Sequence, residues 1–78
     1  MTQYKEDVCF CTNVRNLRKM HNLTKEQMSK VMGIGIHSLN LIEKGIIPQK
    51  LSINAVFALA RYFRISPKNI FTEITYEK

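Results

Sequence analysis

The side chains in this sequence that could bind a metal ion or act as nucleophiles are two cysteines and two histidines. Cys9 and Cys11 form a C-x-C pair, while His21 and His37 stand apart from it. Residues two apart on a helix point about 200° apart, so a disulfide between the cysteines is not expected. The sequence contains no zinc-ligand spacing, nucleophile arrangement or glycine-rich phosphate loop. We therefore predict reduced cysteines, no metal or cofactor, and no enzymatic activity.

The basic residues are more informative. The 78 residues carry 12 Lys and Arg against 6 Asp and Glu, a net charge of +6. Residues 15–68 hold ten of these bases and two acids, Glu26 and Glu43, so this part carries +8 while both ends are slightly acidic. Such a surplus favours a polyanionic partner, either nucleic acid or an acidic membrane surface. Composition alone leaves open a solvated surface that only aids solubility.

Length and composition limit the class of protein. With 45% hydrophobic and 23% charged residues, the chain has the composition of one globular domain. Its longest apolar run, residues 55–60, is too short to span a bilayer, and the polar residues 1–7 do not form a signal peptide. We expect a single cytoplasmic domain over residues 1–78, with its core at about 8–71 and a tail at 72–78, and no membrane association.

Apolar spacing predicts five short helices and places the chain in the all-α class. The first is expected to begin after a cap at Asp7 and to end at about Met20 or His21. The fourth is expected to begin at Ser52, and the fifth at Ser66-Pro67, a cap followed by proline. The buried residues expected on these three helices are Phe10, Val14 and Leu17, then Ile53, Val56, Phe57, Ala60 and Phe63, then Ile70 and Phe71. No strand is expected before residue 72.

The second and third helices are predicted to form a helix-turn-helix. Thr24 and Gln27 have the spacing of a capping box, which begins the second helix, and Gly33 ends it. The third helix begins at Gly35 and ends at Gly45. Only residues 33–35 join the two helices, so the third must cross the second sharply. Their expected buried residues are Met28, Val31, Met32, Leu39 and Ile42.

The order of helices and the short turn are accompanied by a characteristic set of residues. They are Val14 to Arg18, Leu23-Thr24, Met28-Ser29, Gly33, Leu39, Ile42-Glu43, Gly45, Leu59-Ala60 and Ile65-Ser66. With them, residues 14–71 resemble the lambda-repressor-like, XRE-type helix-turn-helix family of phage and bacterial regulators. The resemblance implies a compact five-helix domain that binds double-stranded DNA. It also implies a transcriptional regulator that is encoded by a bacterium or a phage and acts in the cytoplasm.

The resemblance assigns a structural role to Arg18 and Glu43. In this family, an arginine late in the first helix pairs with the glutamate that ends the recognition helix. The pair would fix the angle at which the third helix is presented. The alternative is that these are two unrelated surface charges, because long charged side chains are usually solvated.

The resemblance also places the third helix, at about residues 35–44, in the major groove. Its contact positions there are Gly35, Ile36, His37, Ser38, Asn40 and Leu41. Lys25, at the start of the second helix, is expected to reach a phosphate, as helix N-termini favour anions. Lys44, Gln49 and Lys50 could hold the DNA backbone on the far side.

The contact positions depart from the family pattern because none of them is arginine. The commonest specific contact, Arg or Lys to guanine, is therefore not available from the middle of the helix. Asn40 could pair with adenine, His37 with a purine N7, and Ile36 or Leu41 could touch thymine methyl groups. We expect an A·T-leaning site.

Two alternatives to DNA recognition remain for the aliphatic residues. Ile36, Leu41, Ile46 and Ile47 could form an apolar surface for a protein partner, or Ile36 and Ile46 could be ordinary core. If DNA is the partner, one short helix reads few base pairs, so a homodimer on a palindromic operator with half-sites about 34 Å apart is expected. The resemblance favours a dimer surface in the fifth helix and tail, at Ile70, Phe71, Ile74 and Tyr76.

Overall fold

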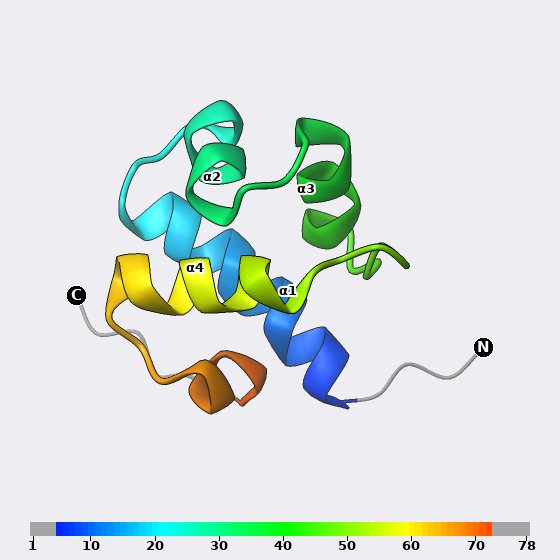
Figure 1. The fold of residues 1–78 in the computed structure, drawn as a ribbon, viewed down its shortest axis with the longest axis vertical. Helices are drawn as coiled ribbons and strands as arrows, with labels where there is room; N and C mark the ends of the chain where they lie inside the picture. Colours follow the sequence, from blue (N-terminus) through cyan, green and yellow to red (C-terminus); the bar gives the residue numbers. More distant parts are fainter. Residues whose placement is uncertain (1–4, 73–78) are drawn as a thin grey trace.

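The computed structural model describes residues 5–72, which form four α-helices and one short 3₁₀ helix (Figure 1). The helices are α1 (Lys5–Met20), α2 (Lys25–Met32), α3 (Ile36–Glu43) and α4 (Ile53–Phe63), followed by the 3₁₀ helix η1 (Pro67–Phe71). The described residues contain no strand, and the all-α class is confirmed. The prediction of five helices is wrong, because the last segment closes only tight three-residue turns, with Asn69 N donating to Ser66 O at 2.9 Å. A segment of five residues is too short for a stable α-helix, and the 3₁₀ helix is the form that such short pieces commonly take.

Side-chain caps set the predicted beginnings of α2 and α4. Thr24 Oγ1 accepts from Gln27 N at 3.1 Å, and Gln27 Oε1 accepts from Thr24 N at 2.8 Å, which confirms the capping box. Ser52 Oγ accepts from Asn54 N at 2.9 Å at the start of α4. The predicted cap at Asp7 is wrong, because α1 already begins at Lys5. Asp7 lies in the first turn of α1, where its carboxylate interacts favourably with the positive end of the helix dipole.

All four α-helices end with the same hydrogen-bond pattern. After each one a residue with positive φ turns the chain, and the next amide donates to a carbonyl five residues earlier. The positive-φ residues are Asn22, Gly33, Gly45 and Arg64. Glycine and asparagine adopt this conformation readily, whereas the Cβ of arginine is strained in it.

Replacement of Arg64 by glycine is expected to stabilise the protein by about 1 kcal/mol, because it removes the strain of the left-handed conformation. Arg64 has φ 57° and is exposed, so the change removes little packing. Chemical unfolding of the wild type, Arg64→Gly and Arg64→Ala measures the effect. The alanine variant keeps the strain and should show no such gain. Equal stability of the two variants would contradict this account of the turn.

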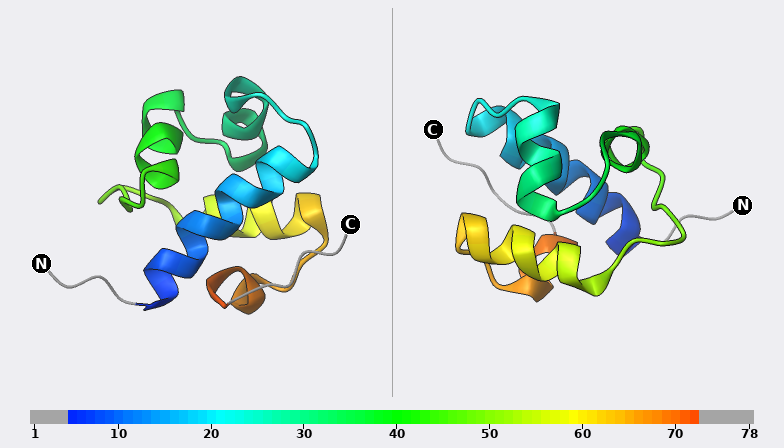
Figure 2. Two further views of the ribbon diagram at one scale, coloured as in Figure 1. Left: turned by 180° about the vertical axis from the view of Figure 1, so that it is seen from behind. Right: turned by 45° about the horizontal axis from the view of Figure 1, so that its top comes forward.

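The core lies where α1 crosses the other helices (Figures 1 and 2). α1 packs against α3 and η1, while α2 packs against α3 and α4, so α3 is held from two sides. The largest fully buried side chains are Phe10, Val14, Met28, Met32, Leu39, Ile42, Leu59 and Ile70. The predicted core is confirmed for α1, α3 and most of α2, where Val31 is half-buried instead of buried.

The predicted buried face of α4 is wrong in part. The helix buries Ala55, Val56, Leu59 and Ala60. Phe63 is half-buried, while Ile53 is 62% exposed and Phe57 46% exposed. Apolar residues occupy most positions of this helix, so their spacing is compatible with more than one buried face. The face that carries small alanines beside Val56 and Leu59 is the one that packs inward, and this leaves an apolar surface at Ile53 and Phe57.

Candidate nucleic-acid interface

The turn between α2 and α3 has the predicted geometry. Gly33 ends α2 with φ 70°, and Gly35 caps α3 with extended backbone angles. A Cβ at Gly33 would meet no atom within 4 Å, so glycine is needed there for its positive φ and not for lack of space. Ser29 is buried in α2, and its Oγ donates to Glu26 O at 2.8 Å. The serine side chain is small, and its hydroxyl finds a hydrogen-bond acceptor within the same helix, so it can be buried where helices pack.

The predicted pair of Arg18 and Glu43 is confirmed. Arg18 Nε donates to Glu43 Oε2 at 2.6 Å, and Nη2 donates to Oε1 at 3.0 Å, a bidentate arrangement. Nη1 donates to Leu23 O at 3.1 Å, so the guanidinium also ties the turn after α1. The side chains are only 15% and 8% exposed. The hydrogen bond to Glu43 raises the pKa of Arg18 above its usual value. The pair joins the end of α3 to α1.

All the predicted contact residues lie on α3 or at its N-cap, and each is at least partly exposed to solvent. Gly35, Ile36 and His37 are exposed, and Ser38, Asn40 and Leu41 are half-buried. Leu39 and Ile42 face the core from the opposite side of the helix. Asn40 Oδ1 is buried and has no hydrogen-bond partner among the described residues. The helix therefore offers a continuous accessible side at its N-terminal end.

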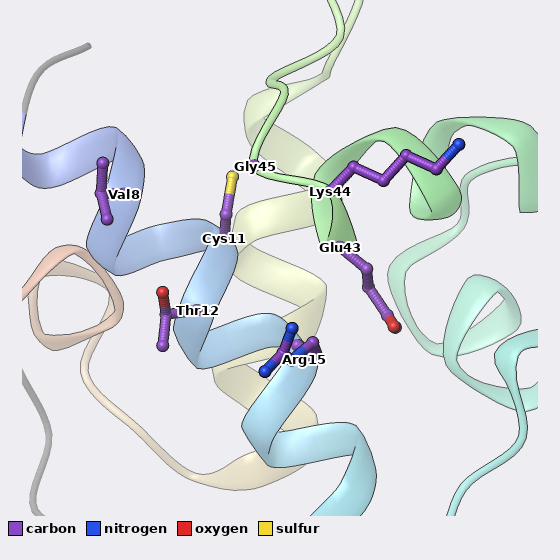
Figure 3. Close-up of a pocket in the computed structure, with 7 residues that line it drawn as sticks. All are labelled: Val8, Cys11, Thr12, Arg15, Glu43, Lys44 and Gly45. Carbon is purple, nitrogen blue, oxygen red and sulfur yellow. The ribbon is translucent and has the colours of Figure 1, made fainter.

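Exposed basic and polar side chains lie on α2 and on the segment that follows α3. Lys25, the first residue of α2, and Lys44, Gln49 and Lys50, which follow α3, are all exposed. A hollow of about 230 Å³ is lined by residues of α1 and of the end of α3 (Figure 3). Lys44 lines it and extends away from it, and the exposed Arg15 lies on its α1 side. Arg15 thus adds to the positive charge near α3, a contribution that the predicted contact set did not include.

Asn13 is a structural residue that the sequence reasoning missed. It is 2% exposed, and its Nδ2 donates to Ile70 O at 2.6 Å and to Thr72 O at 2.8 Å. The amide therefore fastens the end of η1 to α1. The signal in the sequence was a polar residue inside the apolar stripe of the first helix, three residues after Phe10 and one before Val14.

The predicted dimer surface must be corrected. Ile70 is fully buried within its own chain, so it has no surface to offer a second copy. Phe71 is half-buried and stacks on Phe10 with 5.2 Å between ring centroids. Ile74 and Tyr76 lie outside the described residues.

The interpretation of Ile36 and Ile46 as core is wrong, because they are 42% and 50% exposed. Ile47 does pack against the core.

Both cysteines are buried and unpaired with each other. Burial, and secondarily the nearby carboxylate of Asp7, raises the pKa of the Cys11 thiol to about 11. A thiol held neutral in this way is a poor nucleophile at neutral pH. Within residues 5–72 no three His, Cys, Asp or Glu side chains gather as a metal site would require. In the same range no helix is long and apolar enough to cross a membrane.

The fold and the exposed third helix match a known class of protein. A helix-turn-helix family model matches residues 14–70. An uncharacterized HTH-type transcriptional regulator of Methanocaldococcus jannaschii is 33% identical over 54 residues, which cover 69% of this chain and 79% of that protein. No solved structure matches significantly. The chain therefore belongs to the lambda-repressor-like helix-turn-helix family of DNA-binding transcriptional regulators.

Proposed function

We propose that this protein is a transcriptional regulator that binds a specific double-stranded DNA site by placing α3 in the major groove. The observation that carries the proposal is the way in which the rest of the fold holds α3 in place. Leu39 and Ile42 anchor its inner side, and the partly buried ion pair with Arg18 holds its end. Its other side stays accessible. A rigid helix with one open side is what major-groove docking requires.

Phosphate contacts would come from the residues around α3. Lys25 lies at the N-terminus of α2, where backbone amides and the helix dipole also favour an anion. Lys44, Gln49 and Lys50 are exposed on the chain that leaves α3 and would hold the backbone beyond the groove. These contacts position the protein and carry no base preference of their own. The regulator would act in the cytoplasm, where such DNA is accessible.

Base contacts would come from the contact positions on α3, with Gly35 allowing the backbone to approach. Because no arginine is present there, we expect half-sites that lean toward A·T. Selection from a random duplex library tests both points. The expected product is a two-fold symmetric site with A·T-leaning half-sites. G-rich operators would contradict the base preference, and failure to enrich any sequence would contradict specific DNA binding.

A homodimer is the expected state on such an operator. Two large apolar side chains one turn apart on α4, Ile53 and Phe57, are 62% and 46% exposed. Phe57 lines a hollow of about 470 Å³ together with Ile65 and Pro67. An exposed apolar surface beside a hollow can pack against the same surface of a second copy around a two-fold axis.

Sedimentation equilibrium tests this surface. The wild type is expected to dimerise, and Phe57→Glu is expected to be monomeric because it would bury a charge. If Phe57→Glu still dimerises while a variant with Ile74→Glu and Tyr76→Glu does not, the dimer interface lies in the tail and not on α4. A wild type that stays monomeric at high concentration without DNA would contradict the dimer.

A protein-contact module is the second candidate, and the exposure of Ile36 and Ile46 favours it. In that case the apolar side of α3 would pack on a protein, and specific DNA binding would be weak or missing. Apolar contacts are insensitive to salt, whereas phosphate contacts are strongly salt-dependent, so the two functions have different signatures.

A further inference from the structure

The accessible side of α3 has few groups that can hydrogen-bond to a base. Glu43 is the only charged residue of the helix, and Arg18 already holds its carboxylate. The remaining polar side chains are His37, Ser38 and Asn40. Each is neutral or weakly basic, and none has the two parallel donors with which arginine recognises guanine.

Asn40 is less available than its position suggests. Its Oδ1 is buried and has no hydrogen-bond partner in the part of the chain that the structure describes. A bidentate contact with adenine needs both polar atoms of the amide at the base edge. The side chain must therefore turn outward before it can make this contact, and the contact is not preformed in the free protein.

Aliphatic side chains occupy the places where polar ones would be expected. Ile36 is 42% exposed in the first turn of α3. Leu41 follows Leu39 by two residues and so lies about 200° around the helix from that core residue. Leu41 is half-buried, and its position on the helix turns it away from the core residue Leu39. Ile36 and Leu41 lie five positions and so about 140° apart around the helix, on either side of His37 and Asn40, and each would therefore meet a different base position.

We propose that Ile36 and Leu41 make α3 a reader of pyrimidine C5-methyl groups. This inference rests on the proposed function, because it requires that α3 enters the major groove. The thymine methyl is the apolar group on the major-groove edge of the four base pairs. Against a G·C pair the same side chains would cover polar base atoms and leave them without partners, which is unfavourable. 5-Methylcytosine carries its methyl group at the same ring position, so the recognised chemistry is a C5-methylated pyrimidine.

Uracil substitution tests the inference directly, because it removes the methyl group and leaves the hydrogen-bonding edge unchanged. The duplex enriched by selection is compared with versions in which single thymines are replaced by uracil. Affinity is expected to fall about fourfold for each contacted methyl group. The sensitive positions should be few and should be related by the symmetry of the site.

A second arm separates the two sources of the methyl group. At a sensitive position, T·A is replaced by C·G and then by 5-methylcytosine·G. Tighter binding of the methylated than of the unmethylated C·G duplex, by about fourfold, extends the recognition to 5-methylcytosine. No gain, together with a loss on uracil substitution, supports the proposal with thymine as the source.

Variants assign the effect to these side chains. Ile36→Ala and Leu41→Ala are expected to bind thymine and uracil duplexes more equally, while thermal unfolding confirms that they still fold. Lys44→Ala is the matched control, since loss of a phosphate contact should weaken binding to both duplexes by the same factor. Equal binding of the two duplexes by the wild type, or a preference that both aliphatic variants retain, would overturn the inference and leave DNA binding intact. Failure to bind any duplex would overturn the proposed function itself.

Discussion

Replacement of Arg18 by alanine is expected to lower the free energy of unfolding by about 3–5 kcal/mol. The bidentate bonds to Glu43, at 2.6 and 3.0 Å, hold a carboxylate that is only 8% exposed. Without the guanidinium, this carboxylate is left buried and unpaired, and Leu23 O also loses its donor. For a domain of this size, such a loss lowers the melting temperature by about 12 °C or more.

A double-mutant cycle separates the ion pair from the packing of the arginine stem. Arg18→Ala, Glu43→Ala and the double variant are compared by thermal and chemical unfolding. We expect the double variant to be more stable than the sum of the two single losses predicts, because it leaves no unpaired charge. Arg15→Ala, an exposed arginine on the same helix, is the control and should change little. An unchanged melt of Arg18→Ala would refute the structural role of the pair.

Asn13→Asp is expected to be the second large effect, a loss of about 3 kcal/mol or more at neutral pH. The wild-type amide donates from Nδ2 to Ile70 O and Thr72 O, and the residue is 2% exposed. An aspartate places a charged acceptor opposite two carbonyl oxygens, so repulsion replaces two hydrogen bonds. The affected contact joins η1 to α1, and η1 should detach first.

The pH dependence of the Asn13→Asp variant provides a specific signature. Burial beside two carbonyl groups raises the pKa of the introduced carboxyl above its unfolded value of about 3.9. A raised folded pKa means that the stability is present at low pH and is lost as the pH rises through that pKa. Relative to the wild type, the variant should therefore be more stable at pH 4 than at pH 8. Asn13→Leu, which introduces no charge, is the control and should show no such dependence. Wild-type stability of Asn13→Asp at pH 8 would contradict the account.

Local signals and family resemblance explain what the sequence could predict. The capping box of Thr24 and Gln27 and the positive φ of Gly33 depend on a few neighbouring residues, so their patterns were sufficient. The pairing of Arg18 with Glu43 spans 25 positions and was reached through the resemblance, because spacing alone does not indicate which surface charges meet.

The remaining features depend on tertiary packing. α4 is apolar around most of its surface, so only its packing against α2 and η1 decides that Ala55 and Leu59 are buried while Ile53 and Phe57 are exposed. Asn13 could be placed only once the carbonyl groups of η1 were known to lie beside it. The same contact explains why Ile70 is core and cannot form a dimer surface.

The salt dependence of duplex binding tests the central claim most directly. In this account α3 docks in the groove, and the basic side chains that flank it contact phosphates. The logarithm of the binding constant should then fall linearly with the logarithm of salt concentration, with a slope of about −0.9 for each phosphate contact. Lys25→Ala should make the slope shallower by about 0.9, since Lys25 lies at the N-terminus of α2. Lys68→Ala removes the same charge from η1, which packs on α1 and α4 away from the turn between α2 and α3, and it should leave the slope unchanged (Figure 1). Binding that does not respond to salt, or equal slope changes in the two lysine variants, would contradict a DNA-binding surface centred on α3.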